Sequence, residues 1–123
     1  MVDRHLLECA ADLFNRKLYF ECHEVLEDAW AEARGEEKQF LQGLIHLAVG
    51  LYHCAASNYK GAVNQLEKGI RRLEPFLPER SQLDLEGLVS VSTRALGAAK
   101  RGLAGERVHW TEEHRPRLKF RDG

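Results

Sequence analysis

The sequence predicts an all-α protein, a multihelical bundle of about five helices built from antiparallel helix hairpins. Apolar residues recur at helical spacing along most of the chain, and alternation of apolar and polar residues is nowhere sustained. Only 3 prolines interrupt the 123 residues. A weak internal repeat places residues 18–27 in register with residues 58–67, so that a tyrosine, a small residue, a leucine and a glutamate recur in step. Such a repeat favours neighbouring antiparallel helices.

The first two helices are separated by a short turn. We expect the first helix at about residues 3–15, with Asp3 as its N-cap and four apolar residues facing inward: Leu6, Ala10, Leu13 and Phe14. The second helix spans about residues 18–33 and ends at Arg34-Gly35, where the glycine is expected to supply a left-handed C-cap.

Three further helices complete the predicted bundle. The third opens at Glu36 and Glu37, whose charges suit the dipole at a helix N-terminus, and continues to about residue 57. The fourth begins near Tyr59 and ends before Pro75. A proline-containing loop leads to the fifth helix at about 82–103, which is expected to bury Leu85, Leu88, Val89, Ser92, Ala95, Leu96, Ala99 and Leu103.

The length and composition are those of one globular domain. We expect a single helical domain over residues 1–104 and an irregular C-terminal tail over 105–123. The tail either lies across the body, anchored by Trp110 or Phe120, or is mobile. The chain is 44% hydrophobic and 30% charged, and its formal net charge of −1 gives no global field that would attract nucleic acid or an anionic membrane.

The chain also lacks the features of a secreted or membrane protein. Its first residues carry acidic side chains where a signal peptide needs a cationic start and an unbroken apolar run. The uncharged stretch from Gln39 to Tyr59 carries too many polar side chains for a membrane span and is expected to be the central buried helix. Three widely spaced cysteines fit buried thiols in a reducing compartment. We therefore expect a cytoplasmic protein.

The stretch YFECHEVLEDAW at residues 19–30 holds the main candidate site. On a helical wheel one broad arc is apolar and the opposite face, which includes Glu24, is acidic. His23 and Glu27 are neighbours one turn apart, and they fall between Trp30 on one side and Phe20 on the other. A fully solvated pair would not need this aromatic surrounding.

The third helix offers a matching polar strip, which holds Gln39, Gln42, His46 and His53. If the second and third helices form a hairpin about Gly35, residues equidistant from the turn meet. This arrangement predicts a polar pocket between the two helices, with Glu27 near Gln42, His23 near His46 and His53 further along. Gly43 and Gly50 at the edge of the strip cost helix stability, and are expected to permit close approach of another backbone or a ligand.

Three interpretations of this cluster stay open. In the first, the polar groups hydrogen-bond one another and fix helix packing. In the second they line a small-molecule or peptide pocket, and in the third they bind a divalent metal. His23 and Glu27 also have the chemistry of a general acid–base pair. However, HEVLE is not the HExxH zinc motif, because Glu27 stands where its second histidine would be. The sequence assigns no catalytic residue, no metal ligand and no cofactor.

The chain resembles the domain-of-unknown-function family 309. The resemblance is carried by YFECHEVLEDAW at 19–30, EEKQFLQGLIHLAVGLYH at 36–53 and NYKGA at 58–62, and it covers about residues 13–75. It implies a small cytoplasmic all-helical domain. By position it includes six candidate site residues: His23, Glu24, Glu27, Trp30, Gln42 and His53. His46 departs from the family pattern, in which glutamine is commoner, and this weakens the metal interpretation.

The leading hypothesis is a non-enzymatic binding or interaction module that uses the His/Glu pocket between the second and third helices. The alternative is a metal-dependent enzyme, similar to a hydrolase, in which His23 and Glu27 act as ligands or as acid and base. We expect self-association as a dimer and a small-molecule or protein partner, with no membrane and no nucleic acid. The basic residues near the C-terminus are interspersed with acids and lack the interleaved aromatics of a nucleic-acid surface.

Overall fold

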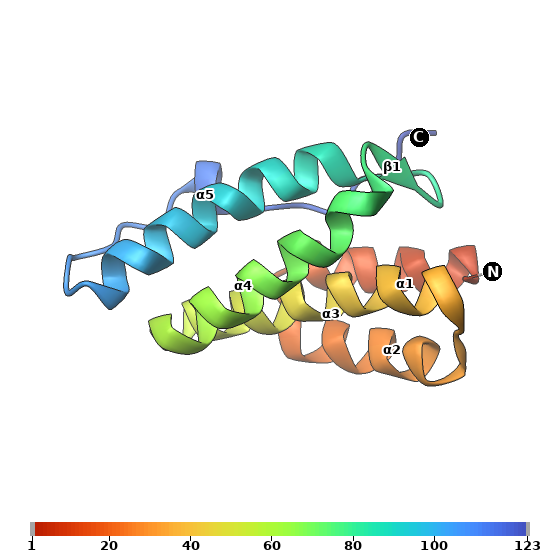
Figure 1. The fold of residues 1–123 in the computed structure, drawn as a ribbon, viewed down its shortest axis with the longest axis horizontal. Coiled ribbons are helices and arrows are strands. Elements are labelled where there is room, and N and C mark those ends of the chain that lie inside the picture. Colours follow the sequence, from red (N-terminus) through yellow and green to blue (C-terminus); the bar gives the residue numbers. More distant parts are fainter. Residues whose placement is uncertain (1, 123) are drawn as a thin grey trace.

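The all-α prediction is confirmed. The computed structural model describes residues 2–122, so the predicted domain limits at residues 1 and 123 lie outside the described part. The five helices are α1 (Arg4–Asn15), α2 (Tyr19–Glu32), α3 (Gly35–Ala55), α4 (Tyr59–Leu73) and α5 (Leu85–Leu103). Two short strands, β1 (Glu79–Arg80) and β2 (Leu83–Asp84), and two 3-10 turns, η1 (Glu74–Phe76) and η2 (Glu112–His114), connect or follow them (Figure 1).

The internal repeat corresponds to two hairpins that are closed by the same turn. After α1, Leu18 N–H donates to the Leu13 carbonyl, and Lys17 takes a left-handed φ of 64°. After α3, Asn58 N–H donates to the His53 carbonyl, and Ser57 takes a φ of 58°. Both are Schellman motifs, with lysine and serine where glycine is commoner. The repeat therefore reflects the turns as well as the helices.

The central helix is α3, as expected. Ten of its residues are buried, and it packs against α2 on one side and α4 on the other. Glycine allows the closest approach, since a Cβ on Gly50 would lie 3.1 Å from the backbone nitrogen of Leu66 in α4. A Cβ on Gly69 of α4 would lie 3.0 Å from the carbonyl oxygen of Gly43. Gly43 and Gly50 were predicted to permit the close approach of another backbone or a ligand. The backbone of α4 is what approaches them.

The ends of two helices differ from the prediction. The second helix ends at Glu32, with Ala33 as its C-cap, whereas Gly35 has a φ of 61° and is the first residue of α3. The fifth helix begins at Leu85 rather than near 82, because residues 79–84 form a tight antiparallel hairpin and Asp84 caps the helix by accepting from Gly87 N–H. Leu103 was expected inside the core but is 53% exposed, at the last position of α5.

The segment after α5 runs back along the body of the molecule. Leu118 is buried, and the Asn15 side chain holds its backbone with two hydrogen bonds, of 2.9 Å to the Leu118 carbonyl and 2.8 Å from its N–H. Further along, Asp84 N–H donates to the Lys119 carbonyl, and Phe120 forms a bridge with Leu83. Trp110 and Phe120, the two anchors named from the sequence, both pack against the core.

The first and last described residues lie at the same end of the molecule (Figure 1). The guanidinium of Arg4 joins them by binding both carboxylate oxygens of Asp122, at 2.9 and 3.1 Å. The turns after α1 and α3 lie away from this end, and the end of α5 lies farthest from it. Within residues 2–122, no helix has the length and apolar character needed to cross a membrane.

Candidate functional site

The seven residues predicted for the site fall into separate groups. His23 and His53 line one groove between α2 and α3. His46 instead binds Gln65 of α4, Gln42 lies beside His46 within α3, and Trp30 contacts Lys38. Glu24 and Glu27 lie on the exposed face of α2. The expected single cluster of His23, Glu27, Gln42 and His46 is therefore a wrong prediction of geometry, since these polar groups do not converge.

His23 and Glu27 form a pair at the surface. The two atoms His23 Nε2 and Glu27 Oε1 are 3.3 Å apart, and the other ring nitrogen of His23 donates to the Phe20 carbonyl at 3.0 Å. Both nitrogens thus face acceptors, and both contacts are hydrogen bonds only when both nitrogens carry protons. The Glu27 side chain is 55% exposed, so this pair is not a buried core network.

His46 belongs to a chain of three polar side chains between α3 and α4. Its Nδ1 lies 2.7 Å from Gln65 Oε1, and its Nε2 lies 3.2 Å from Gln42 Nε2. An oxygen acceptor on one side and an amide donor on the other select the neutral ring with its proton on Nδ1. His46 was expected to face His23 in α2, but its shorter hydrogen bond is to Gln65 of α4, and its other partner, Gln42, belongs to α3 itself.

Burial lowers the pKa of His46 below its ordinary value of 6.5, and the positive charges of Arg72 and Lys68 act in the same direction, while the hydrogen bond to Gln65 opposes them. The unfolded chain therefore binds the proton more tightly than the folded one. The contribution of His46 to stability is fully present above the unfolded pKa and is lost as the pH falls through the lowered folded pKa.

Replacing His46 with glutamine is expected to flatten the pH dependence of stability below pH 6.5, because glutamine keeps a donor for Gln65 but does not titrate. Urea unfolding at a series of pH values would measure this. His5→Gln, at an exposed position in α1, is the control and should leave the profile as it is. An unchanged profile for His46→Gln would show that His46 is not held neutral by the fold.

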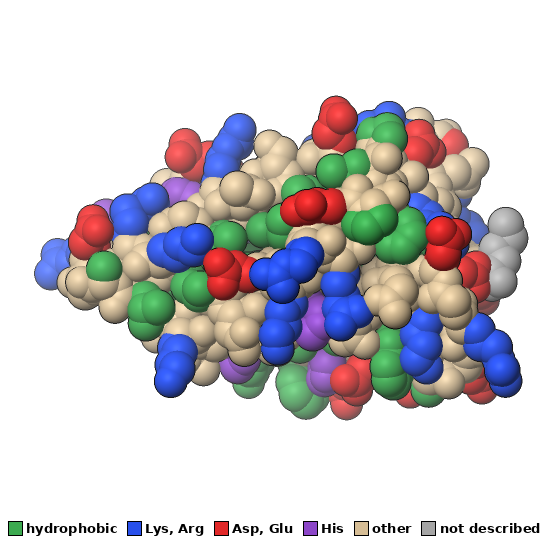
Figure 2. Space-filling model, in the orientation of Figure 1, with side chains coloured by type: hydrophobic (Ala, Val, Ile, Leu, Met, Phe, Trp, Pro, Cys, Tyr) green, Lys and Arg blue, Asp and Glu red, His purple; other side chains and the backbone are tan. Residues whose placement is uncertain are grey.

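An aromatic groove lies between the start of α2 and the end of α3. We use this name for a cleft of about 190 Å³ lined by Tyr19, Phe20, His23, Val49, Tyr52 and His53. The rings of Phe20 and Tyr52 meet across it with centroids 5.9 Å apart, and Phe20 also contacts His23 at 5.2 Å. Phe20 is 49% and Tyr52 46% exposed. Figure 2 shows histidine and hydrophobic side chains together along the lower edge of this face, over α2 and α3.

Trp30 lies outside the aromatic groove, at the other end of α2. The ammonium group of Lys38 sits 3.9 Å from the centre of its ring and donates to the Trp30 carbonyl at 3.2 Å. The indole is half-buried and packs against the core. Trp30 therefore ties the end of α2 to the start of α3 by packing and a cation–π contact.

No group of three or more His, Cys, Asp or Glu side chains within residues 2–122 comes together as a set that could hold a metal ion. His23 and Glu27 form a pair without a third such ligand beside them. The two cysteines nearest this region, Cys22 and Cys54, are buried, and burial raises the pKa of each thiol to about 12. Both remain protonated at neutral pH and act as small core residues.

The sequence contained a signal for the two exposed aromatic residues, although Phe20 was named only as a neighbour of His23 and Glu27, and Tyr52 was not named as a site residue. Phe20 is out of phase with the apolar arc of α2, and Tyr52 is out of phase with the buried face of α3. An aromatic side chain outside the core stripe is the pattern of a surface contact rather than of packing. Their meeting across the groove depends on the relative rotation of α2 and α3, which helical periodicity in one chain does not specify.

Comparison with known families confirms the resemblance inferred from the sequence. Residues 7–65 match the family described as domain of unknown function (DUF309). The match runs from α1 into α4 and includes all seven predicted site residues together with Phe20 and Tyr52. The match begins 6 residues before the expected range of 13–75 and ends 10 residues before its end.

One relative is similar to somewhat less than half of the chain. Over 57 residues, or 46% of this chain, the sequence is 44% identical to the uncharacterized protein YpuF of Bacillus subtilis (strain 168). The aligned segment covers 33% of YpuF, so the chain spans about a third of the length of that relative.

Proposed function

We propose that this chain, whose residues 7–65 match the DUF309 family, is a non-enzymatic binding module that holds an apolar side chain of a basic protein segment in its aromatic groove. The single observation that carries the proposal is the exposure of Phe20 and Tyr52. All ten Phe, Tyr and Trp residues of the chain lie in the described part, and the other eight are buried or half-buried. Only these two are exposed, and they touch each other.

Half-exposed aromatic side chains in contact suit an interface better than a free surface. Aromatic residues are enriched in the cores of protein interfaces, where they supply large contact area with little side-chain entropy to lose. The aromatic groove is open enough to admit one side chain, and Tyr19 and Val49 form its apolar floor. His23 and His53 add polar edges that can orient a bound group.

Charge indicates the class of partner. The exposed face of α2 beside the groove carries five acids and no lysine or arginine: Glu21, Glu24, Glu27, Asp28 and Glu32. Such a face attracts a segment rich in lysine or arginine and repels an acidic one. The partner that fits both features presents a phenylalanine, leucine or similar side chain flanked by basic residues.

The proposal is tested with two short peptides that differ only in charge. The acetylated, amidated tripeptide lysine–phenylalanine–lysine is titrated into 15N-labelled protein, and glutamate–phenylalanine–glutamate serves as its control. The basic peptide is expected to shift the amide signals of Phe20, His23, Tyr52 and His53 in a saturable way. For one anchoring side chain, a Kd on the order of 1 mM is expected. The acidic peptide should bind at least fivefold more weakly.

Matched variants place the binding in the groove. Phe20→Ser and Tyr52→Ser should each abolish the saturable shifts, whereas Leu103→Ser, at an equally exposed apolar position in α5, should leave them intact. Equal binding of the two peptides, or shifts that survive Phe20→Ser, would overturn the proposal. Sedimentation of the free protein identifies the other occupant: a dimer that Tyr52→Ser dissociates would mean that a second copy, not a basic partner, covers the groove.

A further inference from the structure

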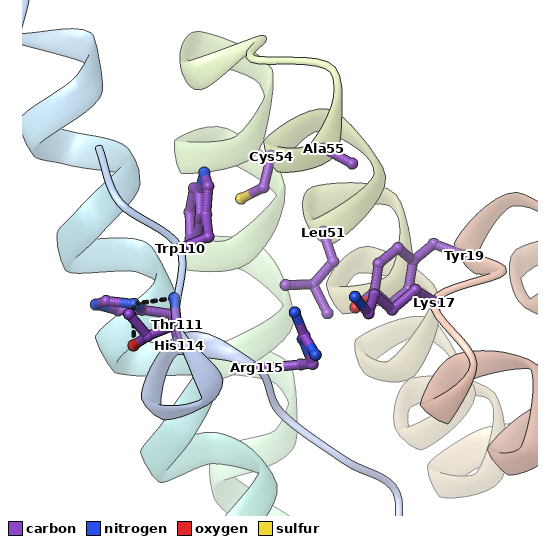
Figure 3. A pocket seen from close by; sticks show the side chains of 9 residues that line it. All are labelled: Lys17, Tyr19, Leu51, Cys54, Ala55, Trp110, Thr111, His114 and Arg115. Carbon is purple, nitrogen blue, oxygen red and sulfur yellow. Dashed lines mark hydrogen bonds between the residues drawn. The ribbon is translucent and has the colours of Figure 1, made fainter. Parts of the chain in front are cut away.

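A second cavity lies on the other side of Tyr19, where the C-terminal segment crosses the end of α3 (Figure 3). It has a volume of about 180 Å³, and its walls come from three separate parts of the chain. Tyr19, Leu51 and Cys54 form one side, and Trp110 forms the other. Figure 3 shows Trp110 and Arg115 extending from the C-terminal segment toward the side chains of Leu51 and Cys54.

We call this space the tail cavity. Its size and lining indicate the apolar part of a ligand that it could hold. A cavity of about 150 Å³ lined by apolar side chains is known to admit benzene, and the tail cavity is slightly larger. Burial raises the pKa of the Cys54 thiol to about 12, so the sulfur presents no negative charge to the cavity at neutral pH. The volume therefore admits one six-membered ring, and Trp110 and Leu51 are among the apolar residues that would contact it.

The mouth of the tail cavity is positive. Lys17 and Arg115 line it, and no lining residue is acidic. Glu112 lies nearby but is shared, since its two carboxylate oxygens face Arg115 and Arg117. Lys17 makes no ion pair within the described residues, and the Schellman turn fixes its backbone at the rim. A second acid, Glu113, lies 3.9 Å from His114 in the cavity lining. Two arginines and a free lysine against these two glutamates still leave a net positive charge.

The wall residue Tyr19 is subject to the same positive charges. Burial raises the pKa of its hydroxyl to about 12, and the charges of Arg115 and Arg117 act against this rise. Arg115 lines the same cavity as Tyr19, so its positive charge faces a group that enters the mouth. An apolar space for one ring and a cationic mouth together select an aromatic anion.

We propose that the tail cavity binds a small aromatic carboxylate, with the ring between Trp110 and Leu51 and the carboxylate at Lys17 and Arg115. This site is independent of the aromatic groove, although both use Tyr19 as a wall. The three side chains that distinguish it, Lys17, Trp110 and Arg115, come from the turn after α1 and from the segment after α5. Trp110 and Arg115 lie beyond the part of the chain that matches DUF309.

Trp110 supplies the readout. In a Trp30→Phe background it is the sole tryptophan, since the chain contains two. Its fluorescence is followed while sodium benzoate is added at constant ionic strength, with benzylamine and benzyl alcohol as charge controls. A saturable change with benzoate is expected, with a Kd on the order of 1 mM. Benzylamine should bind at least tenfold more weakly, because the mouth repels it.

Three variants locate the ligand, and a fourth is the control. Lys17→Gln and Arg115→Gln should each weaken benzoate binding by roughly fivefold. Ala55→Leu, at an exposed helical position on the cavity wall, should block binding without affecting the fold. Phe20→Ser, which opens the aromatic groove, should leave benzoate binding intact. Benzoate binding at the tail cavity and peptide binding at the aromatic groove can therefore succeed or fail independently of each other.

Equal affinity for benzoate and benzylamine would overturn the proposal, and so would the absence of a saturable signal up to 50-fold above the expected Kd. Loss of benzoate binding in Phe20→Ser but not in Ala55→Leu would also overturn it, because the ligand would then occupy the aromatic groove. Circular dichroism of each variant confirms that the helices are retained, so that lost binding reflects the tail cavity itself.

Discussion

Replacing Gly69 with valine is expected to lower the free energy of unfolding by about 3 kcal/mol, and replacing it with alanine by about 1–2 kcal/mol. A Cβ at this position would lie 2.7 Å from a methyl group of Leu47 and 3.0 Å from the carbonyl oxygen of Gly43. Leu47 can rotate away, but the carbonyl belongs to the backbone of α3 and moves only if the two helices separate. The gain in helix propensity from removing a glycine, at most about 1 kcal/mol, does not offset this.

Gly97 is the matched control. It lies inside α5, and a Cβ there would meet only the flexible end of Arg101, at 3.7 Å. Gly97→Ala should therefore raise the free energy of unfolding by up to about 1 kcal/mol, as expected for a helix interior. Urea unfolding of both variants gives the comparison. If Gly69→Ala stabilises the protein as Gly97→Ala does, the close crossing of α3 and α4 is incorrect.

The second large effect is expected at Asn15. Its side chain makes two hydrogen bonds with the backbone of Leu118, and these fix the C-terminal segment against the end of α1. Asn15→Ala leaves both Leu118 groups without their partner in a part-buried place, which should cost about 1–3 kcal/mol. The released segment should then expose the peptide bonds after Arg117 and Lys119 to trypsin.

Limited proteolysis followed by mass spectrometry measures this release directly. The control is Asn64→Ala, at an exposed position of α4, which removes the same side chain without disturbing a described contact and should slightly favour the helix. Cleavage at Arg117 that is no faster in Asn15→Ala than in Asn64→Ala would show that the rest of the segment, through buried Leu118 and the Phe120 bridge, holds the tail on its own.

Much of the fold could be predicted from the sequence, because it depends on local signals. The N-cap of α1 is Asp3, whose side chain accepts from His5 N–H, and the start of α4 after Asn58 is likewise marked by a polar cap. Helical periodicity placed the five helices and the central position of α3. The hairpin at 79–84 was missed because each strand has only two residues, and two residues cannot show an alternating pattern.

The candidate site could be predicted only in part, for a geometric reason. The assumption that residues equidistant from the turn meet correctly placed α2 beside α3, and His23 and His53 line one groove. This assumption does not specify the rotation of each helix about its own axis. The polar strip of α3 borders both α2 and α4, and Gln65 of α4 provides the partner that His46 binds. The tail cavity needs residues nearly a hundred positions apart, Lys17 and Arg115, which no local pattern connects.

The placement of the two chain ends has a practical consequence for attaching this unit to something else. Arg4 and Asp122 hold the start of α1 and the last described residue together at one end of the molecule, whereas the turns after α1 and α3 lie away from that end (Figure 1). Both the aromatic groove and the tail cavity are lined by residues in or next to these turns. An affinity tag, a surface tether or a fused domain added at either terminus would therefore leave both openings free.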